Sequence, residues 1–244
     1  MYRSLNPESI LQEAITLHKR VTERFPSRGI ARVAAEVAEV AREAKERAEW
    51  IARPNWWLRA GVVFLIAVIL LILIAALTSI RMSFEGILDL REFVSFLDAG
   101  FNDLVLIGAA LYFLTRFEIR FKRKRALDAL HELRALAHVI DMHQLTKDPE
   151  RVFPAEWQAT ESSPQENMSA FQLVRYLDYC SELLSILGKV AALYVQKFGD
   201  EVALAAVNEI EELASGLSRK IWQKIMIIRE NVPPNMGERQ VDEL

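Results

Sequence analysis

An uncharged apolar run of 21 residues, from Ala60 to Ile80, constrains this chain more than any other feature. It lies between Arg59 and Arg81 and consists almost entirely of Val, Ile, Leu and Ala. An α-helix rises about 1.5 Å per residue, so a helix of this length spans roughly 30 Å, the hydrocarbon thickness of a bilayer. The run therefore predicts a transmembrane helix. A core helix of a large soluble protein is the alternative, and the long charged segment before the run excludes a secretory signal peptide.

A second span is predicted from the uncharged residues Leu104 to Thr115, which are too few to cross a bilayer alone. The span becomes long enough if it starts near Ala99, which places Asp103 in the outer headgroup layer. Arg116 can then extend into the inner headgroups. The alternative is a single span followed by an interfacial helix.

The distribution of charge predicts the orientation of this hairpin. Residues 116–125 carry six Lys or Arg against Glu118, whereas residues 81–103 carry two arginines against five acids. Positive charge stays on the cytoplasmic side, so both termini are expected there, in a multi-pass protein of the plasma (inner) membrane. The expected membrane-interface residues are Trp56, Trp57, Arg59, Arg116, Arg120, Lys122, Arg123, Lys124 and Arg125, and the expected intramembrane polar residues are Asn102 and Asp103.

The segment between the two predicted spans has the pattern of an amphipathic helix. Apolar side chains recur there at spacings of 3, 4, 3 and 4, while the acidic residues fall on another face. The apolar positions are Ile87, Leu90, Val94, Leu97 and Phe101. Such a helix would lie on the outer leaflet, or it would pack against a copy of itself or a partner.

The remaining sequence predicts helices bounded by recognisable caps. Asn6 followed by Pro7 begins the first helix, and Asp200 caps the last. The predicted helices are Asn6–Phe25, Ile30–Ile51, a stalk that continues from the second span to Leu145, Ala170–Phe198 and Glu201–Asn231. The terminal hairpins are expected to pack on each other or on a second protomer.

The predicted fold class is an all-α integral membrane protein. It has a two-span transmembrane hairpin, an outer amphipathic helix, a long stalk helix and a cytoplasmic helical bundle. The predicted domains are 1–53 (N-terminal helical hairpin), 54–80 (first transmembrane helix), 81–99 (extracytoplasmic amphipathic segment), 100–118 (second transmembrane helix), 119–145 (stalk helix), 146–169 (linker, docked where Val152, Phe153 and Trp157 allow), 170–231 (C-terminal hairpin) and 232–244 (disordered tail).

Three of the four histidines fall within 13 residues of the stalk. On a helical wheel His131 and His138 lie about 20° apart, with Asp141 about 60° from His138. Two imidazoles and a carboxylate on one face are a candidate metal site, above all across an oligomer axis. The two histidines are roughly 10 Å apart along the helix axis, too far to bind one ion from one helix. A polar helix face is the alternative.

No catalytic motif accompanies these residues. The chain has no Walker A loop, no G-x-S-x-G and no cysteine pair, and its nine glycines form no phosphate-binding loop. Its single cysteine, Cys180, lies among apolar residues, as a buried structural thiol does. We therefore expect no enzyme activity and no cofactor. The basic segment is expected to contact anionic lipid and no nucleic acid.

Three functional hypotheses follow from the sequence. The first is a membrane-anchored helical scaffold or interaction protein, which forms a homo-oligomer or recruits a cytoplasmic partner. The second is a small oligomeric channel or transporter subunit, with Asn102, Asp103, Gly108, Tyr112 and Thr115 of the second span lining its interior. The third is a metal-binding sensor or enzyme at the stalk histidines.

Overall fold

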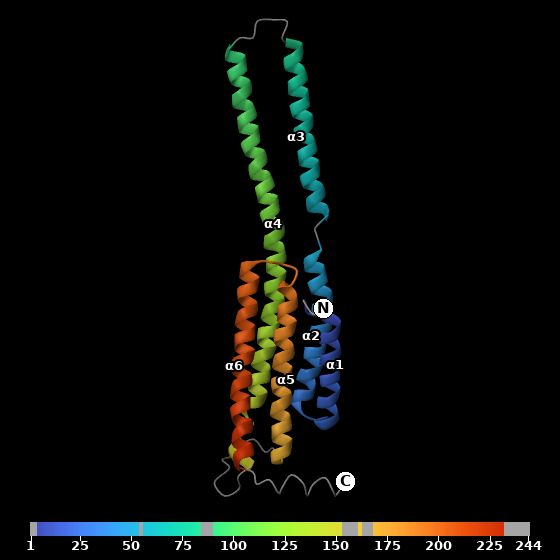
Figure 1. The fold of residues 1–244 in the computed structure, drawn as a ribbon, viewed down its shortest axis with the longest axis vertical. Helices are drawn as coiled ribbons and strands as arrows, with labels where there is room; N and C mark the ends of the chain where they lie inside the picture. Colours follow the sequence, from blue (N-terminus) through green and yellow to red (C-terminus); the bar gives the residue numbers. More distant parts are fainter. Residues whose placement is uncertain (1–3, 54–55, 84–89, 153–160, 163–167, 232–244) are drawn as a thin grey trace. The chain divides into compact units, whose positions relative to one another are not determined.

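The computed structural model describes residues 4–53, 56–83, 90–152, 161–162 and 168–231 (Figure 1). Its elements are α1 (Pro7–Arg24), α2 (Gly29–Ala52), α3 (Trp56–Ser83), α4 (Leu90–Leu145), the 3₁₀ turn η1 (Pro149–Val152), α5 (Ala170–Val195) and α6 (Glu201–Asn231). Every regular element in these ranges is helical, which confirms the all-helical part of the prediction. The chain divides into a bundle, residues 1–52 with 125–244, and a second unit, residues 53–124.

The first two helices form an antiparallel hairpin in the bundle. The side chain of Asn6 accepts a hydrogen bond from the backbone N–H of Glu8 at 2.9 Å, which confirms the predicted cap of α1. Leu17, Val21 and Ile30 are almost fully buried, because they lie on the apolar stripes of their helices.

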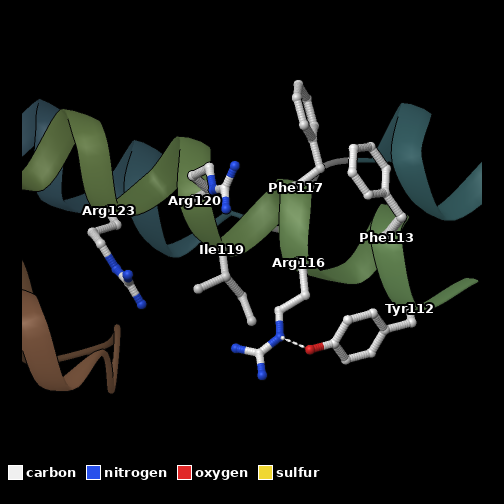
Figure 2. Close-up of a pocket in the computed structure, with 7 residues that line it drawn as sticks. All are labelled: Tyr112, Phe113, Arg116, Phe117, Ile119, Arg120 and Arg123. Atoms are coloured by element: carbon white, nitrogen blue, oxygen red, sulfur yellow. Dashed lines mark hydrogen bonds between the residues drawn. The ribbon is translucent and has the colours of Figure 1, made fainter. Parts of the chain in front are cut away.

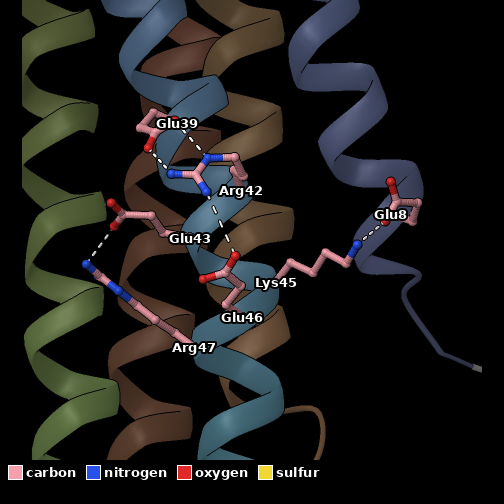
Figure 3. Close-up of polar contacts among 7 residues, drawn as sticks. All are labelled: Glu8, Glu39, Arg42, Glu43, Lys45, Glu46 and Arg47. Carbon is pink, nitrogen blue, oxygen red and sulfur yellow. Dashed lines mark hydrogen bonds and ion pairs between the residues drawn. The ribbon is translucent and has the colours of Figure 1, made fainter.

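Ion pairs lie along α2 and between α2 and α1 (Figure 3). Lys45 of α2 pairs with Glu8 of α1, and along α2 Arg42 donates its Nε–H to Glu39 at 3.0 Å. The Glu8–Lys45 pair joins the two helices and lowers the pKa of the Glu8 carboxyl. Exposed pairs of this kind are screened by solvent and contribute little, so the stability of the hairpin rests on its buried apolar stripe.

Helix α5 is the centre of the bundle, since it packs against α1, α2 and α6. It begins with a capping box, in which Ser169 and Gln172 bond to each other's backbone. At its other end Asp200 accepts a hydrogen bond from the backbone N–H of Ala203 at 3.0 Å and caps α6 as predicted. Leu177, Leu184 and Leu187 are 0% exposed.

The C-terminal part of α4, from Arg125 to Leu145, belongs to the same bundle. Its apolar stripe is buried in the common core and comprises Ala126, Ala129, Leu130, Leu133, Ala137 and Ile140. Glu132 on this helix accepts a hydrogen bond from Arg47 of α2 at 2.6 Å, and Arg134 pairs with Glu209 of α6. The two terminal hairpins and the end of α4 therefore share one core.

The second unit contains α3 and the first part of α4. In the part of the chain that the structure describes, no helix is both long enough and apolar enough to cross a membrane. In α4 the charge-free stretch Leu104–Thr115 has only 12 residues, roughly 18 Å of helix against the 30 Å of a bilayer core. In α3 several side chains lie outside the described set, and its described residues do not supply a spanning stretch either.

This finding overturns the predicted two-span transmembrane hairpin. The assignment of the chain as a multi-pass protein of the inner membrane, with both termini cytoplasmic, falls with it. The interface and intramembrane roles given to the tryptophans, to the basic residues and to Asn102 and Asp103 are not tested by the described residues. The channel hypothesis stays a prediction that the described residues do not test.

The predicted outer amphipathic helix is also corrected. Positions 90–101 are the first turns of α4 and continue without a break into the segment expected to be a separate span. No residue in this region is a helix breaker except Gly100, so the helix propagates through it. Ile87, Phe153, Trp157 and the tail 232–244 lie outside the described residues, whereas Val152 packs against the bundle core.

Candidate functional site

The predicted metal ligands lie on the part of α4 that belongs to the bundle. The side chains of His131 and His138 are exposed, and Asp141 accepts a hydrogen bond from the Nε2 amide of Gln144 at 2.6 Å. Among the described residues no three His, Cys, Asp or Glu side chains gather closely enough to hold a metal ion. The positions of these side chains do not support a metal site on a single chain.

A different group of side chains forms a pocket on α4 in the second unit (Figure 2). We call it the aromatic–arginine face. Its members are Tyr112, Phe113, Arg116, Phe117, Ile119, Arg120 and Arg123. Successive members are one to three residues apart, and on a wheel of 100° per residue they fall within about 160°, so one α-helix brings them all to one side.

Aromatic and cationic groups contact each other directly on this face. Arg116 donates its Nε–H to the phenolic oxygen of Tyr112 at 3.1 Å, and its guanidinium carbon lies 5.2 Å from the centre of the Tyr112 ring. The pair at positions i and i+4 holds the planar guanidinium beside the ring. The arginine side chain is therefore ordered before any ligand arrives, which lowers the entropy lost on binding.

The aromatic side chains of this face are not covered by their own chain. Phe113 is 70% exposed and Phe117 is 53% exposed. Tyr, Phe and Arg are the residue types enriched at protein interfaces, where a few of them supply most of the binding energy. The face combines these types with a pocket and has the composition of a protein contact surface.

The other residues singled out from the sequence have varied surroundings. Trp56 and Trp57 of α3 are highly exposed, and Lys122 pairs with Glu118 on α4 at 2.9 Å. The guanidinium carbon of Arg125 lies 3.4 Å from the centre of the Trp50 ring within the bundle. Lys124 and Asn102 are exposed, and the side chains of Arg59 and Asp103 lie outside the described set.

A buried polar cluster at the C-terminal end of α4 was not predicted. Lys224 of α6 donates from Nζ to the backbone carbonyls of Gln144 at 2.8 Å and Lys147 at 3.2 Å. The Gln144 carbonyl lies in the last turn of α4 and the Lys147 carbonyl just after it, where a cation is favoured. Burial lowers the pKa of Lys224, although Asp148 and Asp141 act in the opposite direction. The only sequence signal was a lysine on the border of the α6 apolar stripe.

The thiol of Cys180 and the phenol of Tyr194 are buried in the bundle. Cys180 is fully buried, which confirms the interpretation of a buried thiol, and desolvation raises its pKa to about 12. Burial also raises the pKa of Tyr194 to about 12, despite the opposing effect of Arg47. Both groups are neutral near pH 7, so neither supplies the thiolate or phenolate that nucleophilic chemistry needs.

Gly29 provides a test of the packing at the end of the bundle. A Cβ at this position would overlap the Cε1 atom of His143, whose ring also lies near Tyr176. We expect Gly29→Ala to lower the free energy of unfolding by about 1 kcal/mol through overpacking. Urea denaturation followed by circular dichroism would measure it.

The double variant Gly29→Ala/His143→Ala is the control, because the second substitution removes the overlapping ring. It should be at least as stable as His143→Ala alone, since alanine favours a helix over glycine. If Gly29→Ala costs the same with and without the His143 ring, the overlap is not the cause.

Comparisons of the chain with models of protein families, with curated proteins and with solved structures find no match.

Proposed function

We propose that this chain is a helical scaffold or interaction protein that assembles through its second unit, residues 53–124. The single observation that carries the proposal is the exposed aromatic–arginine face of α4. The bundle acts as the folded platform, and the second unit is the element that binds another protein surface.

The exposure of apolar side chains extends beyond that face. On α3, Phe64 is 71% exposed and Leu71 is 71% exposed, and on α4 Phe101 is 69% exposed. Folded monomers rarely present large contiguous apolar patches, because each 100 Å² left in water costs about 2.5 kcal/mol. A partner surface that covers these side chains recovers this free energy.

The bundle contrasts with the second unit. Its amphipathic helices turn their apolar stripes to a common core, and ion pairs such as Arg20–Glu182 lie on its outer surface. A surface with charged residues of both signs disfavours non-specific association. Assembly is therefore expected to depend on residues 53–124, with the bundle left unchanged.

The test compares two exposed aromatic residues on different units. Phe113→Asp places a charge in the aromatic–arginine face, whereas Trp222→Asp changes an exposed aromatic of α6 in the bundle, 55% exposed. We expect Phe113→Asp to weaken assembly of the full chain by at least tenfold, since a buried unpaired charge opposes association. Trp222→Asp should leave assembly unchanged, and neither variant should lower the melting temperature of the bundle by more than a few degrees.

Sedimentation velocity over a range of concentrations measures assembly, and circular dichroism measures melting. Equal assembly of the two variants would contradict the proposal. A wild-type chain that stays monomeric and binds only detergent at its apolar surface would contradict the proposal as well.

A further inference from the structure

The face of α4 centred on Ala109 has a symmetric sequence. Counting outward from Ala109, the positions of this face recur at spacings of 4, 3 and 4 residues in both directions. On a wheel of 100° per residue these positions fall within a sector of about 80°. They are Asp98, Asn102, Val105, Ala109, Phe113, Arg116 and Arg120.

This symmetry is chemical as well as geometric. An antiparallel copy centred on Ala109 would place Asp98 opposite Arg120, and Val105 opposite Phe113. In the same register Asn102 faces Arg116. Each acidic or polar residue then meets a guanidinium, and each apolar residue meets another apolar one. Opposite charges in register set the orientation of a helix pair and disfavour the alternatives.

The centre of the face allows two helices to approach closely. Ala109 is the small residue at the centre, and the neighbouring Gly108 and Ala110, about 100° to either side of it on the wheel, are small as well. Small residues at a crossing point let helix backbones come together and increase the packing between them. The bulkier Val105 and Phe113 flank this point and would close over it.

The residues of this face are available for contact. Asp98, Asn102, Ala109 and Arg120 are exposed, and Val105 is 53% exposed. Within the described residues neither Asp98 nor Arg120 has an ion-pair partner on its own chain. They are 22 residues apart on one continuous helix, roughly 33 Å, so they cannot pair with each other within one chain.

We propose that the face of α4 centred on Ala109, from Asp98 to Arg120, binds the same face of a second copy of this chain, antiparallel and with its two-fold axis at Ala109. This proposal rests on assembly through residues 53–124 and names the occupant of that surface. A two-fold contact of this kind repeats each interaction, so one dimer contains the Asp98–Arg120 pair twice.

The first test reverses these charges in the full chain. Asp98→Arg and Arg120→Asp should each weaken dimerisation about tenfold, because each change places like charges opposite one another at two places in the dimer. The double variant Asp98→Arg/Arg120→Asp should restore the wild-type dissociation constant. Unchanged dimerisation in the single variants, or additive loss in the double variant, would overturn the register.

The second test uses disulfide cross-linking in a Cys180→Ser background. Ala109→Cys should cross-link to itself, and a mixture of Asp98→Cys and Arg120→Cys chains should form the mixed dimer. Neither of these two variants should cross-link to itself, since like positions lie roughly 33 Å apart in the antiparallel pair. Self-linking of Asp98→Cys would show a parallel pair and overturn the inference. If the wild-type chain assembles but no link forms at any of these positions, the antiparallel contact is wrong and assembly through residues 53–124 still stands. If the wild-type chain is monomeric, both proposals are wrong.

Discussion

The variant Ala129→Pro is expected to unfold with a free energy about 3 kcal/mol or more below that of the wild type. Proline removes a backbone hydrogen bond of the helix and its ring collides with the preceding turn. Ala129 is 3% exposed and belongs to the continuous helix α4 within the bundle core. The kink would therefore also displace buried neighbours such as Leu130 and Leu133.

Urea denaturation followed by circular dichroism would measure this loss. Ala129→Gly is the control, because glycine keeps the hydrogen bond and costs only about 1 kcal/mol in a helix. A proline variant that unfolds at the same urea concentration as the wild type would show that α4 is not an unbroken part of the bundle.

The variant Leu184→Ala is expected to lose about 2–5 kcal/mol, the range for deleting a fully buried leucine side chain. Leu184 is 0% exposed on the central helix α5. Leu17→Ala on α1, at a position 1% exposed, should lose a similar amount. Both variants should shift one common unfolding transition, because the two chain segments share a core.

Leu204→Ala on α6 is the matched control, since that leucine is 49% exposed and its truncation should cost less than 0.5 kcal/mol, a roughly neutral change. Tryptophan fluorescence and circular dichroism should report the same midpoint for each variant. Two separate transitions, one moved by Leu17→Ala and the other by Leu184→Ala, would contradict a single core.

Local signals were enough to predict most helix boundaries. Asn6 with Pro7, and Asp200 before Glu201, combine a side-chain acceptor with residues that suit a first helical turn, so they marked the starts of α1 and α6. The absence of proline between Gly108 and Pro149 indicated a long helix, and α4 does end at Leu145. Caps and breakers act within a few residues, which is why one sequence reveals them.

Contacts between distant segments could not be predicted in this way. Nothing near Arg47 in the sequence identifies Glu132 as its partner, and nothing near Lys224 identifies the carbonyl groups at the end of α4. Such contacts depend on how the helices pair in space, and an apolar stripe shows only that a face avoids water. The sequence identifies the basic residues of the aromatic–arginine face but does not show that aromatic side chains contact them. The charge pattern alone places these residues beside a membrane.

The same reasoning explains the error in the predicted spans. A run of apolar residues specifies a surface that avoids water, but it does not specify what covers that surface. Lipid and a second protein surface satisfy the pattern equally well at the level of composition. The symmetric arrangement of Asp98, Ala109 and Arg120 carries more information, because charges in register distinguish a protein partner from an apolar solvent.

Sedimentation equilibrium of the full wild-type chain tests the central claim most directly. Assembly of two copies through the face of α4 centred on Ala109 predicts a concentration-dependent mass that approaches twice the 27.9 kDa of one chain. A mass that stays at 27.9 kDa over the whole range of concentrations would contradict the account.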